Sequence, residues 1–374
     1  MAGLYIHIPF CKQKCSYCDF HFSTSLKNKQ DLIQALAKEL SLKSTMVNSP
    51  IETIYFGGGT PSILNPNELE LLVNTIYNHY EVAQKIEFTL ECNPDDLTLQ
   101  QLKTVKKIGV NRLSIGIQSF FDDDLQFFNR AHNAKEAEHS ILMSQDAGFE
   151  NITIDLIYGS PLLTDEKWMK NLETINELNI PHLSAYTLTI EPNTALHHQV
   201  KTGKIHPLED EKTLAQFNTL IERTKQYGLT QYEVSNFGKE NFYSLHNSNY
   251  WKGVEYLGVG PSAHSYIGNK RYWNISHNAK YITAINTGGN YFEEELIDKK
   301  TAYNEYVLTR LRTIWGVDKQ YIKDQFNEKL YQHFEKEVSP YLNSTHLNEE
   351  QGVITLNHKG LFIADKITSD LFWV

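Results

Sequence analysis

Up to about residue 190 the chain alternates between short apolar runs and amphipathic stretches. The apolar runs are rich in Ile, Thr, Tyr, Phe and Leu, which favour strands. They cover residues 3–9, 52–59, 85–92, 112–119, 151–159 and 182–190. Between them, apolar residues recur at helical spacing, and Asn, Asp or Thr precedes several of these stretches as a candidate cap. Strand and helix units in such a row predict parallel strands covered by helices, in a doubly wound sheet or a full or partial barrel.

We favour the barrel, because no glycine-rich dinucleotide motif follows the first strand. The active sites of such barrels collect where the strands end. The cysteines follow the first strand, glycines follow the second, Glu91 and Gln118 end the third and fourth, and Asp155 lies on the fifth. Glycines there could be turn residues alone, whereas a charged or amide group that ends an apolar strand needs a partner.

The composition is that of a globular protein. With 374 residues, 41% of them hydrophobic, the chain can form one large domain and a smaller one. A formal net charge of -10 gives no overall attraction for nucleic acid, and we expect no such partner. The start of the chain shows no basic leader and no apolar run is long enough to cross a bilayer, so we expect a cytoplasmic protein, either a monomer or a homodimer.

Three of the four cysteines lie in the segment CKQKCSYC, at Cys11, Cys15 and Cys18. A thiol cluster in a cytosolic protein more often holds a metal than forms disulfides. With His21 as a fourth ligand it fits a Cys3His zinc site. We favour a 4Fe-4S cluster bound through three of its irons, which leaves the fourth iron open. The fourth cysteine, Cys92, is expected to be a buried free thiol.

The segments CKQKCSYC, GGGTPS, ECNP, SIGIQSF, NRAH and IDLIYGSP occur in this order. With them the sequence resembles the radical S-adenosylmethionine enzymes, in particular the subgroup of the oxygen-independent coproporphyrinogen III oxidase and the heme chaperones related to it. The resemblance covers essentially the whole chain and implies an α/β fold with a partial (β/α)6-type barrel. In this family the open iron binds the amino and carboxylate groups of S-adenosylmethionine, and an electron from the reduced cluster cleaves its sulfonium to a deoxyadenosyl radical.

The resemblance also assigns residues. The three clustered cysteines would bind the iron-sulfur cluster. The residues implied at the S-adenosylmethionine site are Tyr5, Gly58, Gly59, Thr60, Glu91, Gln118, Arg130, Asp155, Ala263 and His264. Residues 58–60, the glycine segment, would let the backbone approach the methionine ammonium, and Arg130 would pair with its carboxylate. Glu91 and Asp155 would bind the ammonium or the ribose hydroxyls, while the last two residues of the set lie where the family closes over the adenine.

Two features separate the oxidase from the chaperones. The oxidase pattern continues C-x-C after the third cysteine, whereas Asp19 and Phe20 follow Cys18 here. The oxidase also has an extra segment ahead of its first strand, and this chain starts with the strand. In addition, residues 246–251, HNSNYW, match the H-N-x-x-Y-W motif of the heme chaperones. We therefore expect a heme chaperone that passes heme to acceptor hemoproteins, respiratory enzymes among them; the alternatives are the oxidase, another radical enzyme, or a zinc-stabilised binding protein.

The H-N-x-x-Y-W motif suits heme chemistry, because a neutral imidazole can bind heme iron and aromatic rings can cover a porphyrin face. The residues expected to bind heme are His246, Asn247, Tyr250 and Trp251. Taken alone, the histidine could instead cap a loop or form a hydrogen bond between domains. The alternative heme ligands are His197, His198 and His277.

After residue 300 the pattern changes to small helices around a hairpin. This part resembles the winged-helix-like, mostly helical C-terminal domain of the subgroup, which we expect to pack against the barrel mouth. We thus expect three parts: a barrel over 1–235, a connecting region over 236–299 that carries the HNSNYW and GVGPSAH segments and closes the barrel, and the C-terminal domain over 300–374.

Overall fold

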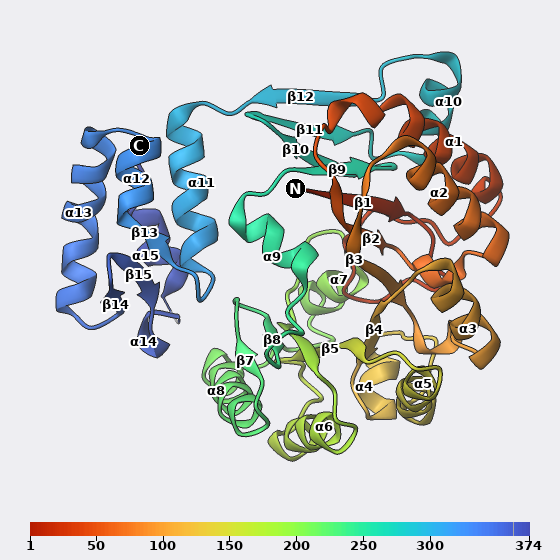
Figure 1. The fold of residues 1–374 in the computed structure, drawn as a ribbon. Coiled ribbons are helices and arrows are strands. Elements are labelled where there is room, and N and C mark those ends of the chain that lie inside the picture. Colours follow the sequence, from red (N-terminus) through yellow and green to blue (C-terminus); the bar gives the residue numbers. More distant parts are fainter. Residues whose placement is uncertain (362) are drawn as a thin grey trace.

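The protein is described by a computed structural model at residues 1–361 and 363–374 (Figure 1). Its main body is a curved sheet in which six parallel strands follow one another in chain order. These strands are β1 (Ala2–Ile8), β2 (Ile51–Gly58), β3 (Val82–Cys92), β4 (Arg112–Gln118), β5 (Asn151–Tyr158) and β6 (His182–Thr187). The predicted partial barrel is confirmed. The sixth strand ends three residues before the predicted end at 190, because the chain turns away after Leu188 N–H bonds to Tyr158 O.

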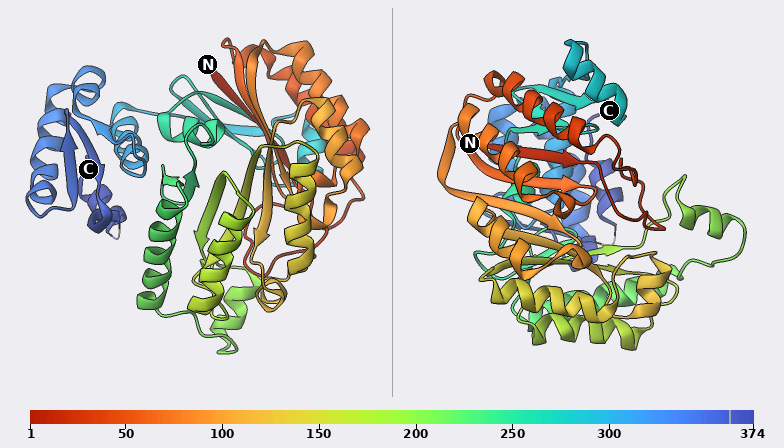
Figure 2. Two further views of the ribbon diagram at one scale, coloured as in Figure 1. Left: turned by 60° about the horizontal axis from the view of Figure 1, so that its bottom comes forward. Right: turned by 90° about the vertical axis from the view of Figure 1, so that its right-hand side faces the viewer.

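Helices cover the outer face of this sheet (Figure 1). They are α1 (Lys29–Leu42), α2 (Pro66–His79), α3 (Leu99–Ile108), α4 (Asp122–Phe127), α5 (Ala134–Asp146), α6 (Asp165–Glu177) and α8 (Asp210–Gln226), with short 3-10 turns at η1 (Ser44–Met46), η2 (Pro61–Ile63) and η3 (Pro94–Asp96). Helix α7 (Ala195–Lys201) instead protrudes from the body (Figure 2). Four of the predicted caps form, whereas Asn28 before α1 makes no side-chain cap bond. Asn65 and Asn133 begin α2 and α5 with capping boxes, and Thr98 and Thr164 cap α3 and α6.

Further strands extend the sheet at both edges. Beside β1 lie β9 (Tyr256–Val259), which is parallel to it, and then the antiparallel β10 (His264–Ile267), β11 (Lys270–Asn274) and β12 (Phe292–Leu296). Helix α10 (Asn278–Thr287) joins the last two. Beside β6 lie β8 (Asn236–Gly238) and β7 (Thr230–Gln231). In the described part of the chain no strand pairs β12 with β7, so the sheet stays open, and the predicted boundary after residue 235 falls between the paired strands β7 and β8.

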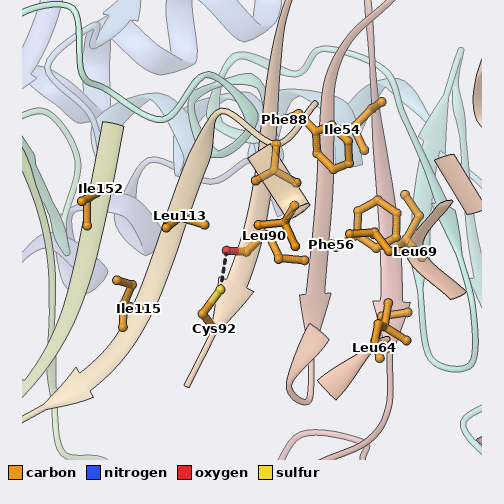
Figure 3. Packing of buried hydrophobic residues seen from close by; sticks show 14 of the residues in the cluster. Ile54, Phe56, Leu64, Leu69, Phe88, Leu90, Cys92, Leu113, Ile115 and Ile152 are labelled. Carbon is orange, nitrogen blue, oxygen red and sulfur yellow. Dashed lines mark hydrogen bonds between the residues drawn. The ribbon is translucent and has the colours of Figure 1, made fainter. Parts of the chain in front are cut away.

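The face of the sheet toward the helices is apolar. Figure 3 shows Phe56 and Phe88 packed with Leu90, Leu113 and neighbouring aliphatic residues. Burying such a side chain contributes roughly 1.5–3 kcal/mol. Cys92 lies in this layer, 4% exposed, with its Sγ 3.5 Å from Leu90 O. The prediction of a buried free thiol is confirmed.

The C-terminal domain has a hydrophobic core of its own, which includes Tyr303, Phe334 and Ile354. Its elements are α11 (Lys299–Leu311), β13 (Val317–Asp318), α12 (Lys319–Gln325), α13 (Glu328–Asn343), β14 (Leu347–Glu350), β15 (Val353–Leu356), α14 (His358–Leu361) and α15 (Ala364–Asp370). The strands form a small sheet in the order β13-β15-β14. The β14–β15 hairpin follows α13, the third helix of this domain. This arrangement confirms the predicted mostly helical, winged-helix-like domain.

The expectation that this domain packs against the barrel mouth is wrong. Ile314 N–H bonds to the carbonyl of Tyr232, whose hydroxyl lies 2.8 Å from His182 Nε2, at the start of β6. Lys252, at the end of α9 (Leu245–Lys252), lies 4.2 Å from the centroid of the Trp315 ring. The domain therefore contacts the end of the barrel where the strands begin, because α9 and Tyr232 offer it aromatic and cationic surface there. None of the described helices is long and apolar enough to cross a membrane.

Candidate cofactor site

The inner face of the barrel is polar. Inward positions alternate with the apolar outward ones, and in the first three strands they are occupied by Tyr5, His7, Thr53, Tyr55, Glu87, Thr89 and Glu91. Register places them side by side, with Thr53 opposite Glu87 and Tyr55 opposite Thr89. Parallel strands that are buried on both faces are normally apolar almost throughout. A polar interior therefore marks the inside of this barrel as a place for ligands or for chemistry.

The three clustered cysteines lie in the loop that follows β1, partly buried and not joined by disulfides. The glycine segment fixes the start of this loop, because Gly59 N–H bonds to Ile8 O and Thr60 N–H bonds to Phe10 O, at 2.9 and 2.7 Å. Farther along, Ser16 N–H bonds to Phe128 O at 3.0 Å. The loop is thus held between the end of β2 and the segment after β4.

Burial raises the pKa of the Cys11 thiol to about 11, although a hydrogen bond with Thr60 and the charge of Arg130 act in the opposite direction. Burial also raises the pKa of Cys18. Cysteines bind metals as thiolates, so cluster binding at these sulfurs would release protons.

Arg130 provides a buried positive charge at this end of the barrel. Its Nη1 donates to Cys15 Sγ at 3.2 Å, and its Nη2 donates to Asn93 Oδ1 and Gly116 O, both at 2.8 Å. Its buried Nε has no hydrogen-bond partner among the described residues. A buried N–H without an acceptor is costly. This N–H could therefore donate to an additional acceptor, which fits an anionic group such as the predicted carboxylate.

The glycine segment and Glu91 are joined directly. Gly58 has φ +108°, and a Cβ there would lie 2.5 Å from the His7 ring. Its N–H donates to Glu91 Oε2 at 3.1 Å, while the Tyr55 hydroxyl donates to Glu91 Oε1 at 2.7 Å. This position therefore accepts only glycine, both for its backbone conformation and for the ring beside it.

Two carboxyl groups face the interior with raised pKa values. Burial raises the pKa of Glu91 to about 7, against the effect of the Tyr55 and Gly58 hydrogen bonds. Burial likewise raises the pKa of Asp155 to about 6. Gln118, at the end of β4, is buried with φ 70°. Buried carboxylates favour a cationic ligand, and the residues at this end fit the ammonium and sulfonium of S-adenosylmethionine.

Tyr5 is one of the polar side chains of the barrel interior. Its hydroxyl is 3.0 Å from His7 Nδ1, and His7 Nε2 is 3.0 Å from the carbonyl of His21. Because a carbonyl only accepts, the His7 proton is on Nε2 and Tyr5 donates to Nδ1. The imidazole of His21 has its Nε2 2.7 Å from Asn278 Oδ1. Among residues 1–361 and 363–374, no three His, Cys, Asp or Glu side chains are grouped as around a single metal ion.

Ala263 and His264 follow β9 at the same end of the barrel. Ala263 is buried and His264 is exposed. The turn before them is fixed by Glu39, whose Oε2 accepts the Gly260 N–H at 2.7 Å, and it lies against His7, since a Cβ at Gly260 would be 2.6 Å from His7 O. Most of the predicted S-adenosylmethionine residues thus lie at or just beyond the strand ends, whereas Tyr5 and Asp155 lie in the middle of β1 and β5.

An open cavity of about 740 Å³ lies beside the cysteine loop. Cys18, Phe20 and Phe22 line one side, and Pro192 and Asn193 line the other. The right-hand view of Figure 2 shows the loop after β1 and the protruding α7 at the same end of the molecule. Leu196 N–H of α7 bonds to Ser16 O at 2.8 Å, which joins the two.

His246 lies at the other end of the interior, where β1 and β2 begin. Its Nδ1 is 2.8 Å from Thr53 Oγ1 and its Nε2 is 2.8 Å from the Tyr250 hydroxyl. The side chain is 2% exposed. Burial, and then the charge of Arg112, lower the pKa of His246 to about 3. The imidazole is therefore neutral, but in this conformation both ring nitrogens are engaged by hydroxyl groups.

The helix that carries His246 is held at its N-terminus. Glu87 accepts the N–H groups of Leu245 and His246, each at 2.9 Å, and the guanidinium of Arg112 lies 4.0 Å from Glu87. Asn247, Tyr250 and Trp251 are each partly exposed. The four predicted heme residues are thus together on α9, away from the cysteine loop.

The alternative histidines lie elsewhere. His197 is half-buried and His198 is exposed on α7. His277 begins α10 as its cap, with Nδ1 3.4 Å from Lys280 N. His277 is therefore already engaged in a structural role.

Sequence reasoning missed four interior residues, namely His7, Tyr55, Glu87 and Arg112. Arg112 is buried with hydrogen bonds to Thr89 and Thr153, and its Nε, which has no hydrogen-bond partner in the described chain, lies 4.0 Å from Glu87 Oε2. A signal was available for the first three, because each of them stands between apolar neighbours in a strand that should be apolar on both faces, whereas Arg112 follows Asn111 at the start of its strand.

Comparisons with known proteins agree with this geometry. Residues 5–189 match the model of the Radical SAM superfamily, and residues 297–365 match that of the HemN C-terminal domain. Heme chaperone HemW of Bacillus subtilis (strain 168) is 31% identical over 371 residues, 98% of each chain. Heme chaperone HemW of Lactococcus lactis subsp. lactis (strain IL1403) is 33% identical over 369 residues, 97% of this chain and 95% of the relative.

Among solved structures, the coproporphyrinogen III oxidase HemN of Escherichia coli, described as a radical SAM enzyme, superimposes with a TM-score of 0.87. It is 22% identical, over 99% of this chain and 90% of its own. Similarity at this level of identity shows the fold, whereas the full-length relatives at more than 30% identity show the family. The chain therefore belongs to the heme chaperone HemW family of the radical SAM superfamily.

Proposed function

We propose that this protein binds a 4Fe-4S cluster, S-adenosylmethionine and heme, and passes heme to acceptor hemoproteins, respiratory enzymes among them, in the cytoplasm. The observation that carries the proposal is the similarity to heme chaperone HemW over 98% of both chains. The geometry supports it, because a polar barrel interior has a thiol loop at one end and the H-N-x-x-Y-W motif at the other.

At the first end, the three clustered cysteines would hold the cluster. Arg130, with its unpaired Nε, would hold a carboxylate. The glycine segment and Glu91 would orient an ammonium or ribose hydroxyls, together with Tyr5, Gln118 and Asp155. When bound, S-adenosylmethionine supplies a sulfonium that a reduced cluster can cleave. Ala263 and His264 would cover the adenine from the turn after β9.

At the second end, His246 would bind the heme iron, with Asn247, Tyr250 and Trp251 around the porphyrin. Iron needs a lone pair on a ring nitrogen, and both nitrogens are occupied in the closed position. Heme binding would therefore require the Tyr250 hydroxyl to leave Nε2 or α9 to open. The fully neutral imidazole is already in the protonation state that metals require.

The test is a hemin titration of reconstituted wild type and His246→Ala, followed in the Soret band, with iron and sulfide assays on the same samples. We expect His246→Ala to alter or greatly weaken the heme spectrum while the cluster still assembles. Transfer is then measured by mixing heme-loaded protein with an apo-hemoprotein of distinct spectrum. Equal heme affinity and spectra in the two proteins would exclude His246 as the ligand, and lack of transfer would exclude a chaperone.

The second candidate is oxygen-independent coproporphyrinogen III oxidase, which the structural similarity to HemN favours. Asp19 and Phe20 stand where the oxidase pattern has C-x-C. We therefore expect no protoporphyrinogen IX when cluster-loaded protein receives coproporphyrinogen III, S-adenosylmethionine and reductant. Turnover to that product would establish the oxidase instead.

A further inference from the structure

A column of side chains crosses the barrel interior and connects its two ends. Tyr55 on β2 stands in the middle, 8% exposed. Its hydroxyl donates to Glu91 Oε1 at 2.7 Å, and Glu91 Oε2 in turn accepts the Gly58 N–H at 3.1 Å. On the other side, its ring stacks on the imidazole of His246, with centroids 5.0 Å and planes 27° apart. One side chain therefore touches both a residue of the cofactor end and the central residue of the H-N-x-x-Y-W motif.

The backbone leaves room for this column at Gly57. A Cβ at this inward position would lie 2.8 Å from the Tyr55 ring, and 3.0 Å from both Glu91 Oε1 and the Tyr5 ring. A contact of 2.8 Å is closer than non-bonded carbon atoms approach. The absence of a side chain at Gly57 is thus explained by the packing of Tyr55 and Glu91.

We propose that Tyr55 is a positioning residue for both ends of the barrel: its hydroxyl orients Glu91 toward the cationic part of S-adenosylmethionine, and its ring retains the His246 imidazole in the interior. This inference rests on the proposed function. A buried carboxylate needs hydrogen-bond donors, and Glu91 has two, the Tyr55 hydroxyl and the Gly58 amide. Removal of the hydroxyl leaves one donor, while removal of the ring also ends the contact with His246.

The role of the Tyr55 hydroxyl and the role of its ring predict different changes in ligand binding. Glu91 titrates near neutral pH, with a pKa of about 7. Without the Tyr55 donor its carboxylate is less stabilised, so its pKa rises, and attraction for a cation begins at higher pH. The ionisable groups around Glu91 are Tyr5 from β1, Tyr55 from β2, Cys92 from β3, Arg112 from β4, Asp155 from β5, Tyr186 from β6 and Tyr250 from α9. Among these, Asp155 is the carboxyl that titrates in a similar range, with a pKa of about 6.

The experiment compares Tyr55→Phe and Tyr55→Leu with wild type after anaerobic cluster reconstitution. The control is Tyr80→Phe, because Tyr80 is equally buried at 8% and its hydroxyl donates to Leu40 O at 2.7 Å in the outer layer. S-adenosylmethionine affinity is measured by equilibrium dialysis with labelled ligand at several pH values around neutrality. Heme affinity is measured by hemin titration on the same preparations.

We expect Tyr55→Phe to weaken S-adenosylmethionine binding about tenfold at pH 7 and to move its pH dependence upward, with hemin affinity unchanged. Tyr55→Leu should show the same loss and, because His246 is released more easily, bind hemin about fivefold more tightly. Tyr80→Phe should match wild type in both. Wild-type S-adenosylmethionine affinity and pH profile in Tyr55→Phe, or an equal loss in Tyr80→Phe, would overturn the inference. Wild type that binds neither ligand would instead overturn the proposed function.

Discussion

The position of His246 leads to a prediction about the heme-free protein. The imidazole accepts or donates hydrogen bonds at both nitrogens, to Thr53 and to Tyr250, each at 2.8 Å, and it is 2% exposed. His246→Ala removes both bonds and leaves the buried Thr53 hydroxyl and the partly buried Tyr250 hydroxyl without this partner. With roughly 1 kcal/mol for each bond and a further penalty for the unpaired hydroxyls, the opening of α9 becomes easier by about 3 kcal/mol. If the imidazole were instead exposed to solvent in the heme-free protein, its removal would not change the free energy of opening of α9.

Hydrogen exchange at the N-terminus of α9 measures this opening. The N–H groups of Leu245 and His246, which donate to Glu87, are protected only while α9 stays in place. About 3 kcal/mol corresponds to roughly hundredfold faster exchange in the variant. His198→Ala, at an exposed imidazole on α7, should exchange there like wild type. Exchange in His246→Ala within about threefold of wild type would refute the reasoning, because the ring would then not hold the helix.

Three further predictions concern the cofactor end. Serine in place of the three clustered cysteines should abolish the roughly four irons and four sulfides that reconstituted wild type carries, which iron and sulfide assays measure; iron retained by the triple variant, or stoichiometric zinc in the native protein, would contradict the assignment. The pKa of Glu91 is about 7 in the folded state against a reference of 4.5, so its stabilising contribution is present below pH 4.5 and is lost as pH rises through 7. In denaturation of the apoprotein, Glu91→Gln should therefore be more stable than wild type at pH 8, by up to about 3 kcal/mol, with no gain at low pH; a gain that does not vary with pH would contradict this explanation. Gly57→Ala should lower the free energy of unfolding by about 1–3 kcal/mol, because the added Cβ would contact the Tyr55 ring too closely. An unchanged free energy of unfolding would show that the side-chain column adjusts to the Cβ without loss of stability.

Much of the barrel could be predicted from the sequence, because the period of the apolar residues and the length of each apolar segment identify strands and helices locally. The first five predicted strands lie within two residues of β1–β5 except where β3 begins earlier, at Val82. The polar residues at the strand ends also meet as predicted, since parallel strands bring their ends to one edge. The place of the C-terminal domain was predicted wrongly. Its position depends on contacts such as Lys252 with Trp315, between side chains that no local pattern relates.

The sequence by itself determined the family and predicted the chemistry of the cysteine loop. Ligand spacing of C-x3-C-x2-C and the motifs that follow it are local properties of the chain, and they need no knowledge of distant contacts. Only the tertiary structure decided the state of the H-N-x-x-Y-W motif. Whether His246 faces solvent or the interior depends on how α9 lies across the starts of β1 and β2, and its partners Thr53 and Tyr55 are far away in sequence. The fold brings these side chains together because strand register puts them on the inner face, and burial then makes each of them the hydrogen-bond or stacking partner of the histidine.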